Sequence, residues 1–118
     1  MSASVPGTVW PIGTTRTFET DVAAGAGGTQ DVATPLTMAF SRVTTVASDG
    51  DSVALPPAVG GQLMAVVNTH ATNSVNVWPA IGTADTIDGG ADDNIPATRA
   101  HQFASFGPGL WHVVATTA

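Results

Sequence analysis

The sequence predicts an all-β domain, and three observations support this prediction. From residue 34 onward, short runs rich in Val, Thr, Leu and Phe alternate with turn signals such as "SDGD" (48–51) and "GPG" (107–109). The turns recur about every 8–12 residues, a spacing typical of an antiparallel sandwich or barrel. No window beyond residue 34 has the period of a helix. We therefore expect an antiparallel β-domain over residues 34–118.

Residues 1–33 differ from the rest of the chain and predict an extended N-terminal arm with at most one short strand. Pro, Gly and Thr alternate there with isolated large apolar residues, and "DVAAGAGGTQDVATP" (21–35) is small-residue loop material. Exposing Trp and Phe on such an arm is unfavourable, so we expect them to be buried against a neighbouring subunit or in the protein's own core. The predicted interface residues are Val9, Trp10, Ile12 and Phe18 of the arm, with Trp78 of the domain.

The first strands of the domain follow from residue pattern and proline positions. "LTMAF" (36–40) alternates apolar and polar positions, and "RVTTVAS" (42–48) continues it after a phase slip that indicates a bulge or a break. "DSVALPP" (51–57) is a strand that its two prolines end, because proline cannot donate to a ladder. "GQLMAVVN" (61–68) is almost continuously apolar and predicts a central, well-covered strand.

The later strands include the stretch "VNVWPAIGTADTIDGG" (75–90). Val75 and Val77 share one face of this strand, Trp78-Pro79 ends it, and a Gly/Asp loop leads to a short strand near Ile87. "TRAHQFASF" (98–106) and "LWHVVA" (110–115) are the last two strands, with "GPG" as the turn between them.

Composition excludes several classes of function. The formal net charge is −6, lysine is absent, and Arg16, Arg42 and Arg99 are scattered, so direct binding of nucleic acid is not expected. There is no cysteine for thiol chemistry or zinc, no apolar run long enough to span a membrane, and no secretory signal at the N-terminus. Only 10% of residues are charged, which suits a protein packed against copies of itself or a partner, or reflects a compositional bias of the source genome.

Side chains that could carry out chemistry are few and poorly arranged for it. His70, His101 and His112 have no close ligand spacing, no serine lies in a nucleophile elbow, and the single glutamate, Glu19, lies in the arm. Asp49 flanks a predicted hairpin turn. We therefore expect no catalytic residue, no cofactor and no metal, and we do not expect an enzyme.

The aspartates of the Gly/Asp loop leave one alternative open. Asp88, Asp92 and Asp93, with Gly89 and Gly90, could supply oxygen ligands to Ca²⁺. Their spacing differs from that of a calcium loop and the closing Glu is missing, so a solvated loop is the favoured interpretation. A small enzyme or a calcium-dependent binder that uses residues 88–93 stays a third hypothesis.

Residues 43–114 resemble a known β-domain. The pattern is "DSVALP", a glycine pair, an apolar strand ending in Asn, "SVNVWPAIG", "IDG", and a last strand that follows Gly and contains Trp. It is similar to a domain that recurs in small structural proteins of tailed bacteriophages, including capsid decoration (cement) proteins and some fibre or tail-associated proteins. The resemblance covers about 70 residues and implies a homotrimer of jelly-roll-like β-sandwich subunits in the virion.

The expected function is that of a capsid decoration protein. Such a protein binds the major capsid protein on the outer surface of the mature head and stabilises contacts between capsomers. The alternative is a tail, neck or head-fibre module that binds carbohydrate, in which Trp10, Trp78 and Trp111 could each stack on a sugar ring. Core or interface packing is the favoured interpretation of each Trp.

Overall fold

The computed structural model describes residues 18–117, and this part of the chain is built from β-strands. The all-β prediction is therefore confirmed. In chain order the elements are β1 (Phe18–Ala23), the 3-10 turn η2 (Gln30–Val32), β2 (Thr34–Pro35), β3 (Phe40–Thr45), β4 (Asp51–Ala54), β5 (Leu63–Asn68), β6 (Val75–Trp78), β7 (Thr86–Ile87), β8 (Asp93–Ile95), β9 (Ala100–Gly107) and β10 (Leu110–Thr116).

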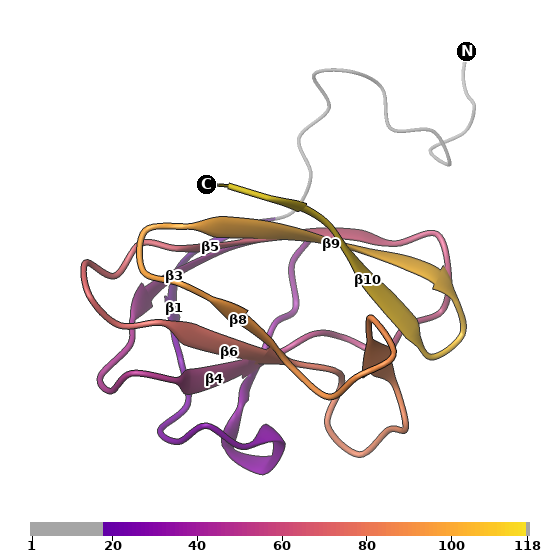
Figure 1. The fold of residues 1–118 in the computed structure, drawn as a ribbon, viewed down its shortest axis with the longest axis horizontal. Helices are drawn as coiled ribbons and strands as arrows, with labels where there is room; N and C mark the ends of the chain where they lie inside the picture. The colour runs from indigo at the N-terminus through magenta and orange to yellow at the C-terminus, as the bar shows by residue number, and fades with distance from the viewer. Residues whose placement is uncertain (1–17, 118) are drawn as a thin grey trace.

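The strands form two sheets that lie one above the other (Figure 1). Sheet A has six strands in the order β1-β3-β5-β9-β10-β7, and sheet B has four in the order β2-β4-β6-β8. From β1 to β6, successive strands alternate between sheet A and sheet B, so the chain winds between the layers in successive coils. This is the arrangement of a β-solenoid.

The prediction of antiparallel pairing is wrong for most of the described strands. The pairs β1–β3, β3–β5, β2–β4, β4–β6 and β7–β10 are parallel, and only β5–β9, β9–β10 and β6–β8 are antiparallel. The reason is that turns such as "SDGD" and "THATN" carry the chain from sheet A to sheet B, so strands adjacent in sequence do not pair. A jelly-roll arrangement is accordingly not evident, whereas the predicted "GPG" hairpin between β9 and β10 is confirmed.

The connections of successive coils stack on one another. The backbone N–H of Gly50, in the turn between β3 and β4, donates to the carbonyl of Ser74, in the turn between β5 and β6, at 2.9 Å. The N–H of Ala24, after β1, donates to the carbonyl of Thr45 at the end of β3, also at 2.9 Å. Each coil therefore satisfies backbone groups of the next, as parallel stacking requires.

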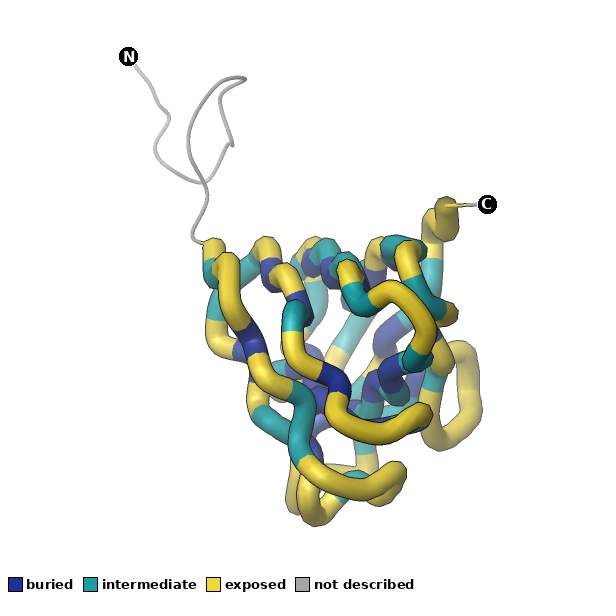
Figure 2. The backbone as a smooth tube through the Cα atoms, turned by 90° about the vertical axis from the view of Figure 1, so that its left-hand side faces the viewer, coloured by how far each residue is buried: buried dark blue, intermediate teal, exposed yellow. Residues whose placement is uncertain are grey.

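The core lies between the two sheets, and both layers contain buried residues, which are dark blue in Figure 2. Sheet A contributes Val43, Val66, Phe103 and Trp111, and sheet B contributes Val53, Val75, Val77 and Ile95; all eight are completely buried. The indole Nε1–H of Trp111 donates to the carbonyl of Pro56 at 3.1 Å, so the largest core side chain has its polar atom satisfied.

Residues 18–33 of the predicted arm belong to these sheets. β1 pairs in parallel with β3, Val22 and Ala33 are buried, and Gly25 forms an isolated bridge with Ser52. The predicted boundary at residue 33 therefore does not separate two structural units within the described chain. Two further differences are that the predicted strand 36–40 lies largely outside β2 and β3, and that β8 falls in a stretch expected to be loop.

Candidate interaction surface

The outward side of sheet A carries apolar residues where a water-facing sheet would carry polar ones. Along β3, β5 and β9, buried positions alternate with positions that are exposed or half-buried. The outward positions of sheet A include the polar residues Arg42, Gln102 and His112; the apolar residues among the outward positions, which we call the apolar face, are Phe18, Phe40, Leu63, Ala65, Val67, Ala104, Phe106 and Leu110. Sheets with one solvated face usually present polar side chains there, so this face has the composition of a contact surface.

Two of its aromatic side chains are among the most exposed apolar groups of the described chain. Phe106 at the end of β9 is 68% exposed, and Phe18 at the start of β1 is 58% exposed. The ring of Phe106 makes an edge-on contact with that of His112, with 5.5 Å between the centroids. A large exposed apolar area on one side of a small protein indicates a site where another surface packs.

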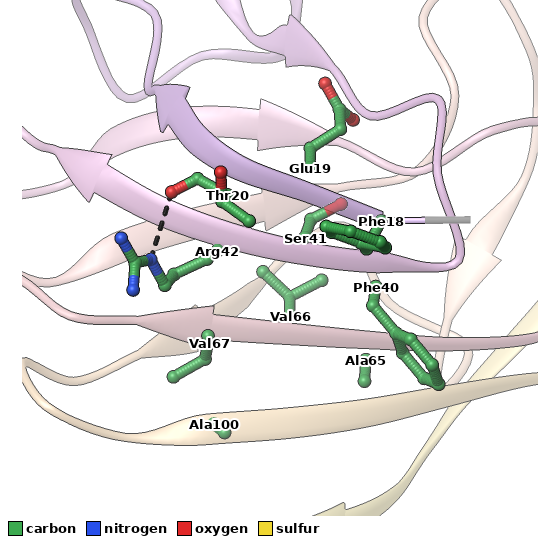
Figure 3. A pocket seen from close by; sticks show the side chains of 10 residues that line it. All are labelled: Phe18, Glu19, Thr20, Phe40, Ser41, Arg42, Ala65, Val66, Val67 and Ala100. Atoms are coloured by element: carbon green, nitrogen blue, oxygen red, sulfur yellow. Dashed lines mark hydrogen bonds between the residues drawn. The ribbon is translucent and has the colours of Figure 1, made fainter. Parts of the chain in front are cut away.

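A shallow hollow of about 250 Å³ lies in the apolar face (Figure 3). Phe18 and Phe40 border it on one side and Arg42 on the other, while the small side chains of Ala65 and Ala100 leave the space between them. This relief gives the face a shape that a complementary side chain can fill, which a flat sheet does not offer.

Two polar side chains beside the hollow form hydrogen bonds with the protein's own chain. Arg42 donates from Nε to the carbonyl of Thr20 at 3.0 Å, which ties β3 to β1. Glu19 Oε1 accepts from both the N–H and the hydroxyl of Thr37, each at 3.2 Å. These hydrogen bonds hold Arg42 and Glu19 in place at the border of the hollow.

The predicted interface residues fall in three places. Val9, Trp10 and Ile12 lie outside the described residues. Phe18 is on the apolar face, at the edge of sheet A. Trp78 is half-buried in sheet B, where its Nε1–H donates to the carbonyl of Gly28 at 3.1 Å, so the structure does not place it on the same surface as Phe18.

The sequence analysis missed most members of the apolar face, above all Phe40, Leu63 and Phe106. The outward position of Phe40 could have been predicted from Arg42. The two residues are on the same side of β3, and the core would not accommodate the charged side chain of Arg42. The mistaken strand at 36–40 hid this signal, because it placed Phe40 in phase with Leu36, which is a core residue.

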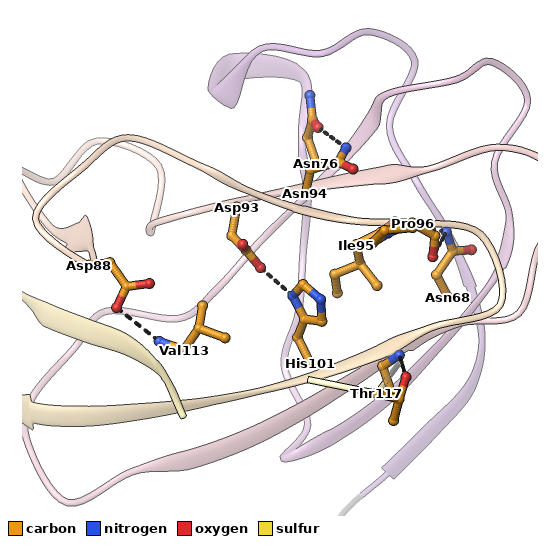
Figure 4. A network of polar contacts seen from close by, with 11 residues as sticks. Asn68, Asn76, Asp88, Asp93, Asn94, Ile95, Pro96, His101, Val113 and Thr117 are labelled. Atoms are coloured by element: carbon orange, nitrogen blue, oxygen red, sulfur yellow. Dashed lines mark hydrogen bonds and ion pairs between the residues drawn. The ribbon is translucent and has the colours of Figure 1, made fainter. Parts of the chain in front are cut away.

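Two of the histidines form separate pairs with two aspartates of the Gly/Asp loop, and Figure 4 shows the pair of His101 with Asp93. His101 Nδ1, on β9, lies 2.6 Å from Asp93 Oδ2, on β8, so this pair links sheet A to sheet B. His112 Nδ1 lies 3.2 Å from Asp88 Oδ1, which also accepts from the N–H of Val113. Asp88 and Asp93 thus have different partners, and within residues 18–117 no three His, Cys, Asp or Glu side chains are grouped to hold a metal ion.

Asn68 joins the end of β5 to two neighbouring segments. It is completely buried, and its Nδ2 donates to the carbonyls of Asn73 at 2.9 Å and Ile95 at 3.2 Å (Figure 4). Its Oδ1 accepts from the N–H of His70 at 3.0 Å. Asn68 is the last residue of the predicted central strand, and its side chain therefore fixes the following turn and has a structural role.

One carboxyl group in the stacked turns has a shifted pKa. The backbone N–H and then the hydroxyl of Ser74 donate to Asp49 Oδ1, at 2.7 and 2.9 Å, and these hydrogen bonds lower the pKa of Asp49 below its ordinary value. Asp49 therefore joins two coils and is not part of a simple hairpin.

None of the helical turns in residues 18–117 has the length and apolarity that crossing a membrane requires.

Comparisons with protein-family models, with curated proteins and with solved structures found no match to this chain. What can be said of its function rests on its own residues and on the surface described above.

Proposed function

We propose that this protein is a structural protein of a tailed-bacteriophage virion, a decoration protein that binds the major capsid protein on the outside of the mature head. The observation that carries the proposal is the apolar face of sheet A. A protein that joins subunits already assembled works by contact area and shape, and this face provides both. The phage-like pattern of residues 43–114 points to the same class.

The apolar face also suits self-association into a homotrimer. On the adjacent strands Phe40 lies beside Ala65 and Ala104 beside Leu63, while Arg42 borders Val67 and Gln102 borders Ala65, so the apolar positions form a patch that polar side chains interrupt. Burying such a face removes apolar area from water at about 25 cal/mol per Å² before the costs of association are subtracted. Copies packed around a threefold axis would remove part of this face from solvent and leave the rest of it to contact capsomers.

Two measurements test this proposal. The first is the native mass of the purified protein over a dilution series, by sedimentation or light scattering. A stable species at three times the chain mass of 11.8 kDa is expected. The second is co-sedimentation with undecorated heads of the phage, where saturable binding at the outer surface is expected. Heads that take up none of the protein would contradict the proposal.

A matched pair of variants connects the binding to the apolar face. Leu63, on the face, is 41% exposed, and Ile81, in the loop after β6, is 44% exposed. Leu63→Glu places a charge where the partner surface must pack, and should weaken trimer formation or head binding at least tenfold. Ile81→Glu makes the same change at equal exposure away from the face, and should leave both unaffected. Equal effects of the two variants would mean that the face is not the contact.

A further inference from the structure

Trp78, which the apolar face does not include, borders a second hollow on the other side of the molecule. This hollow has a volume of about 310 Å³, at the lower end of the range of about 300–1,000 Å³ that small-molecule sites occupy. Its walls come from three segments that are distant in sequence: Gln30 in η2, Trp78-Pro79 at the end of β6, and residues 83–91 around β7.

The Trp78 hollow has a firmly held frame. Trp78 donates from Nε1 to the carbonyl of Gly28, which fixes the indole on the neighbouring loop. Gln30 Nε2 donates to the carbonyls of Pro79 and Ala80, at 2.9 and 3.0 Å, which holds η2 beside the strand end. A site built in advance spends little binding energy on ordering its own side chains.

Several polar atoms at this hollow have no protein partner. Among the described residues, neither the hydroxyl of Thr86 nor Oε1 of Gln30 takes part in a hydrogen bond. Asp85 uses Oδ2 to accept from the N–H of Ala58 at 2.9 Å, and its Oδ1 makes no hydrogen bond in the described chain. Residues that line the hollow therefore carry two acceptor atoms and one hydroxyl without a hydrogen-bond partner in the described chain, beside a large aromatic side chain.

This combination fits one class of ligand. A pyranose ring has an apolar C–H face that packs on an aromatic ring, and hydroxyl groups around its rim that donate to acceptors such as carboxylate and amide oxygens. Among the described residues, Asp85 is the only charged one that lines the hollow, and the chain has a net charge of −6. Acidic sugars would be repelled, so the expected ligand is neutral.

We propose that the Trp78 hollow is a binding site for a neutral pyranose unit of a saccharide. The site is independent of the proposed decoration function, because it lies at the β7 edge of sheet A, whereas the hollow in the apolar face lies over β1, β3 and β5. A protein attached to a head by one surface could thus hold a glycan with the other. Lone monosaccharides should bind weakly, with Kd near 1 mM or above, since one ring buries little area.

The experiment is an amide NMR titration of the full chain with methyl glycosides of glucose, galactose, mannose and N-acetylglucosamine. At least one glycoside should move the backbone signals of Trp78, Thr86, Gly89 and Gly90 in a saturable way, while those of Leu63 and Ala104 stay in place. Methyl glucuronide should have a weaker effect. If no glycoside moves these signals, or if tetramethylammonium moves them and no glycoside does, the proposal is overturned.

Two variants and one control assign any binding to the hollow. Trp78→Ala should weaken binding about tenfold or more through loss of the aromatic wall. Because it also removes the hydrogen bond to Gly28, Thr86→Val serves as a second variant: it loses only an unpartnered hydroxyl and should weaken binding about two- to tenfold. Leu63→Ala, on the apolar face over β5, should leave the Kd unchanged.

Head attachment measured on the same variants separates this proposal from the decoration function. Thr86→Val should attach to heads as the unaltered protein does. Attachment without glycoside binding overturns the saccharide site alone, whereas glycoside binding without attachment overturns the decoration function alone. Binding that survives both Trp78→Ala and Thr86→Val would place the saccharide elsewhere and also overturn the proposal.

Discussion

The outer side of sheet B is covered by the protein's own chain, whereas no segment within residues 18–117 is placed over the apolar face of sheet A. The loop before η2 bridges β4 through Gly25 and Ser52, and it accepts hydrogen bonds from the side chains of Ser52, at Gly27, and of Trp78, at Gly28. Where this cover ends, the exposed positions are polar: Asn94 donates to Asn76 at 2.7 Å and to Ser74 at 3.1 Å.

The difference shows how one fold can cover the outer side of one sheet within the subunit and leave the outer side of the other sheet for a partner. Both sheets share the same core, so their inner sides meet the same requirement for burial. Their outer sides differ because sheet B receives polar residues and a loop that covers part of it, while sheet A receives Phe, Leu, Ala and Val at many outward positions, interrupted by Arg42 and Gln102. Four changes test this comparison, in order of decreasing effect.

The largest effect is expected from Trp111→Ala, which removes the core side chain that both sheets share. Trp111 is completely buried, and its loss should lower the free energy of unfolding by about 3–5 kcal/mol. Urea unfolding followed by circular dichroism measures the change. A change near zero in the free energy of unfolding would mean that Trp111 does not hold the two sheets together.

The next effect concerns the cover of sheet B and is expected from Gly25→Ala. A Cβ atom at position 25 would lie 1.8 Å from the carbonyl oxygen of Val32, so the loop must move or strain. The free energy of unfolding should fall by about 1–3 kcal/mol, and the fluorescence of Trp78 should shift to longer wavelength as the loop lifts.

Gly90→Ala is the matched control for this change. Its Cβ would be 3.6 Å from the nearest atom, the carbonyl oxygen of Ile87, which is ordinary contact distance, and its stability should hardly change. If both variants are equally stable, the loop that covers sheet B is not tightly packed on it.

A smaller effect on the subunit is expected from Phe106→Lys on the apolar face. Because Phe106 is 68% exposed, the free energy of unfolding of the isolated subunit should change by less than about 0.5 kcal/mol. Self-association, measured by sedimentation equilibrium, should weaken clearly in the same variant. A large loss of stability at high dilution would show that Phe106 is part of the subunit's own core.

The smallest effect is a pH dependence at the stacked turns. Hydrogen bonds from Ser74 lower the pKa of Asp49 in the folded state below the ordinary value of 3.8. A group whose pKa falls on folding stabilises the folded state above its unfolded pKa, and this contribution is lost as the pH drops through the lower, folded value. Asp49→Asn should therefore reduce the acid dependence of urea unfolding below a pH of about 4, and an unchanged dependence would contradict the assignment.

The sequence indicated most strands but few of their partners. Runs such as "GQLMAVVN" and "LWHVVA" correspond to β5 and β10, because alternation and β-branched residues act locally. Pairing depends on which sheet each turn leads to. Asp49-Gly50 has the residues of a hairpin turn, yet here Gly50, with φ of 86°, carries the chain across to sheet B.

A repeat in the sequence is a signal that could have indicated the coil. "DSVALPPAVG" (51–60) and "NSVNVWPAIG" (73–82) have Ser, Val, Pro, Ala and Gly at equivalent places. Their strands, β4 and β6, lie side by side and parallel in sheet B. Internal repeats of about 20–50 residues are typical of solenoids, so this pair favours parallel stacking over hairpins.

By itself the sequence determined that the protein is built from strands and that its few charges leave little for electrostatic binding, since these depend on local pattern and composition. For Trp111 it favoured core or interface packing, and the structure placed it in the core. Only the tertiary structure decided which face of each strand meets the other sheet, and so which apolar residues are left outside. Phe40 and Phe103 are alike in type, yet one is exposed and the other completely buried. The cause is register, because a shift of one residue in a strand exchanges its two faces.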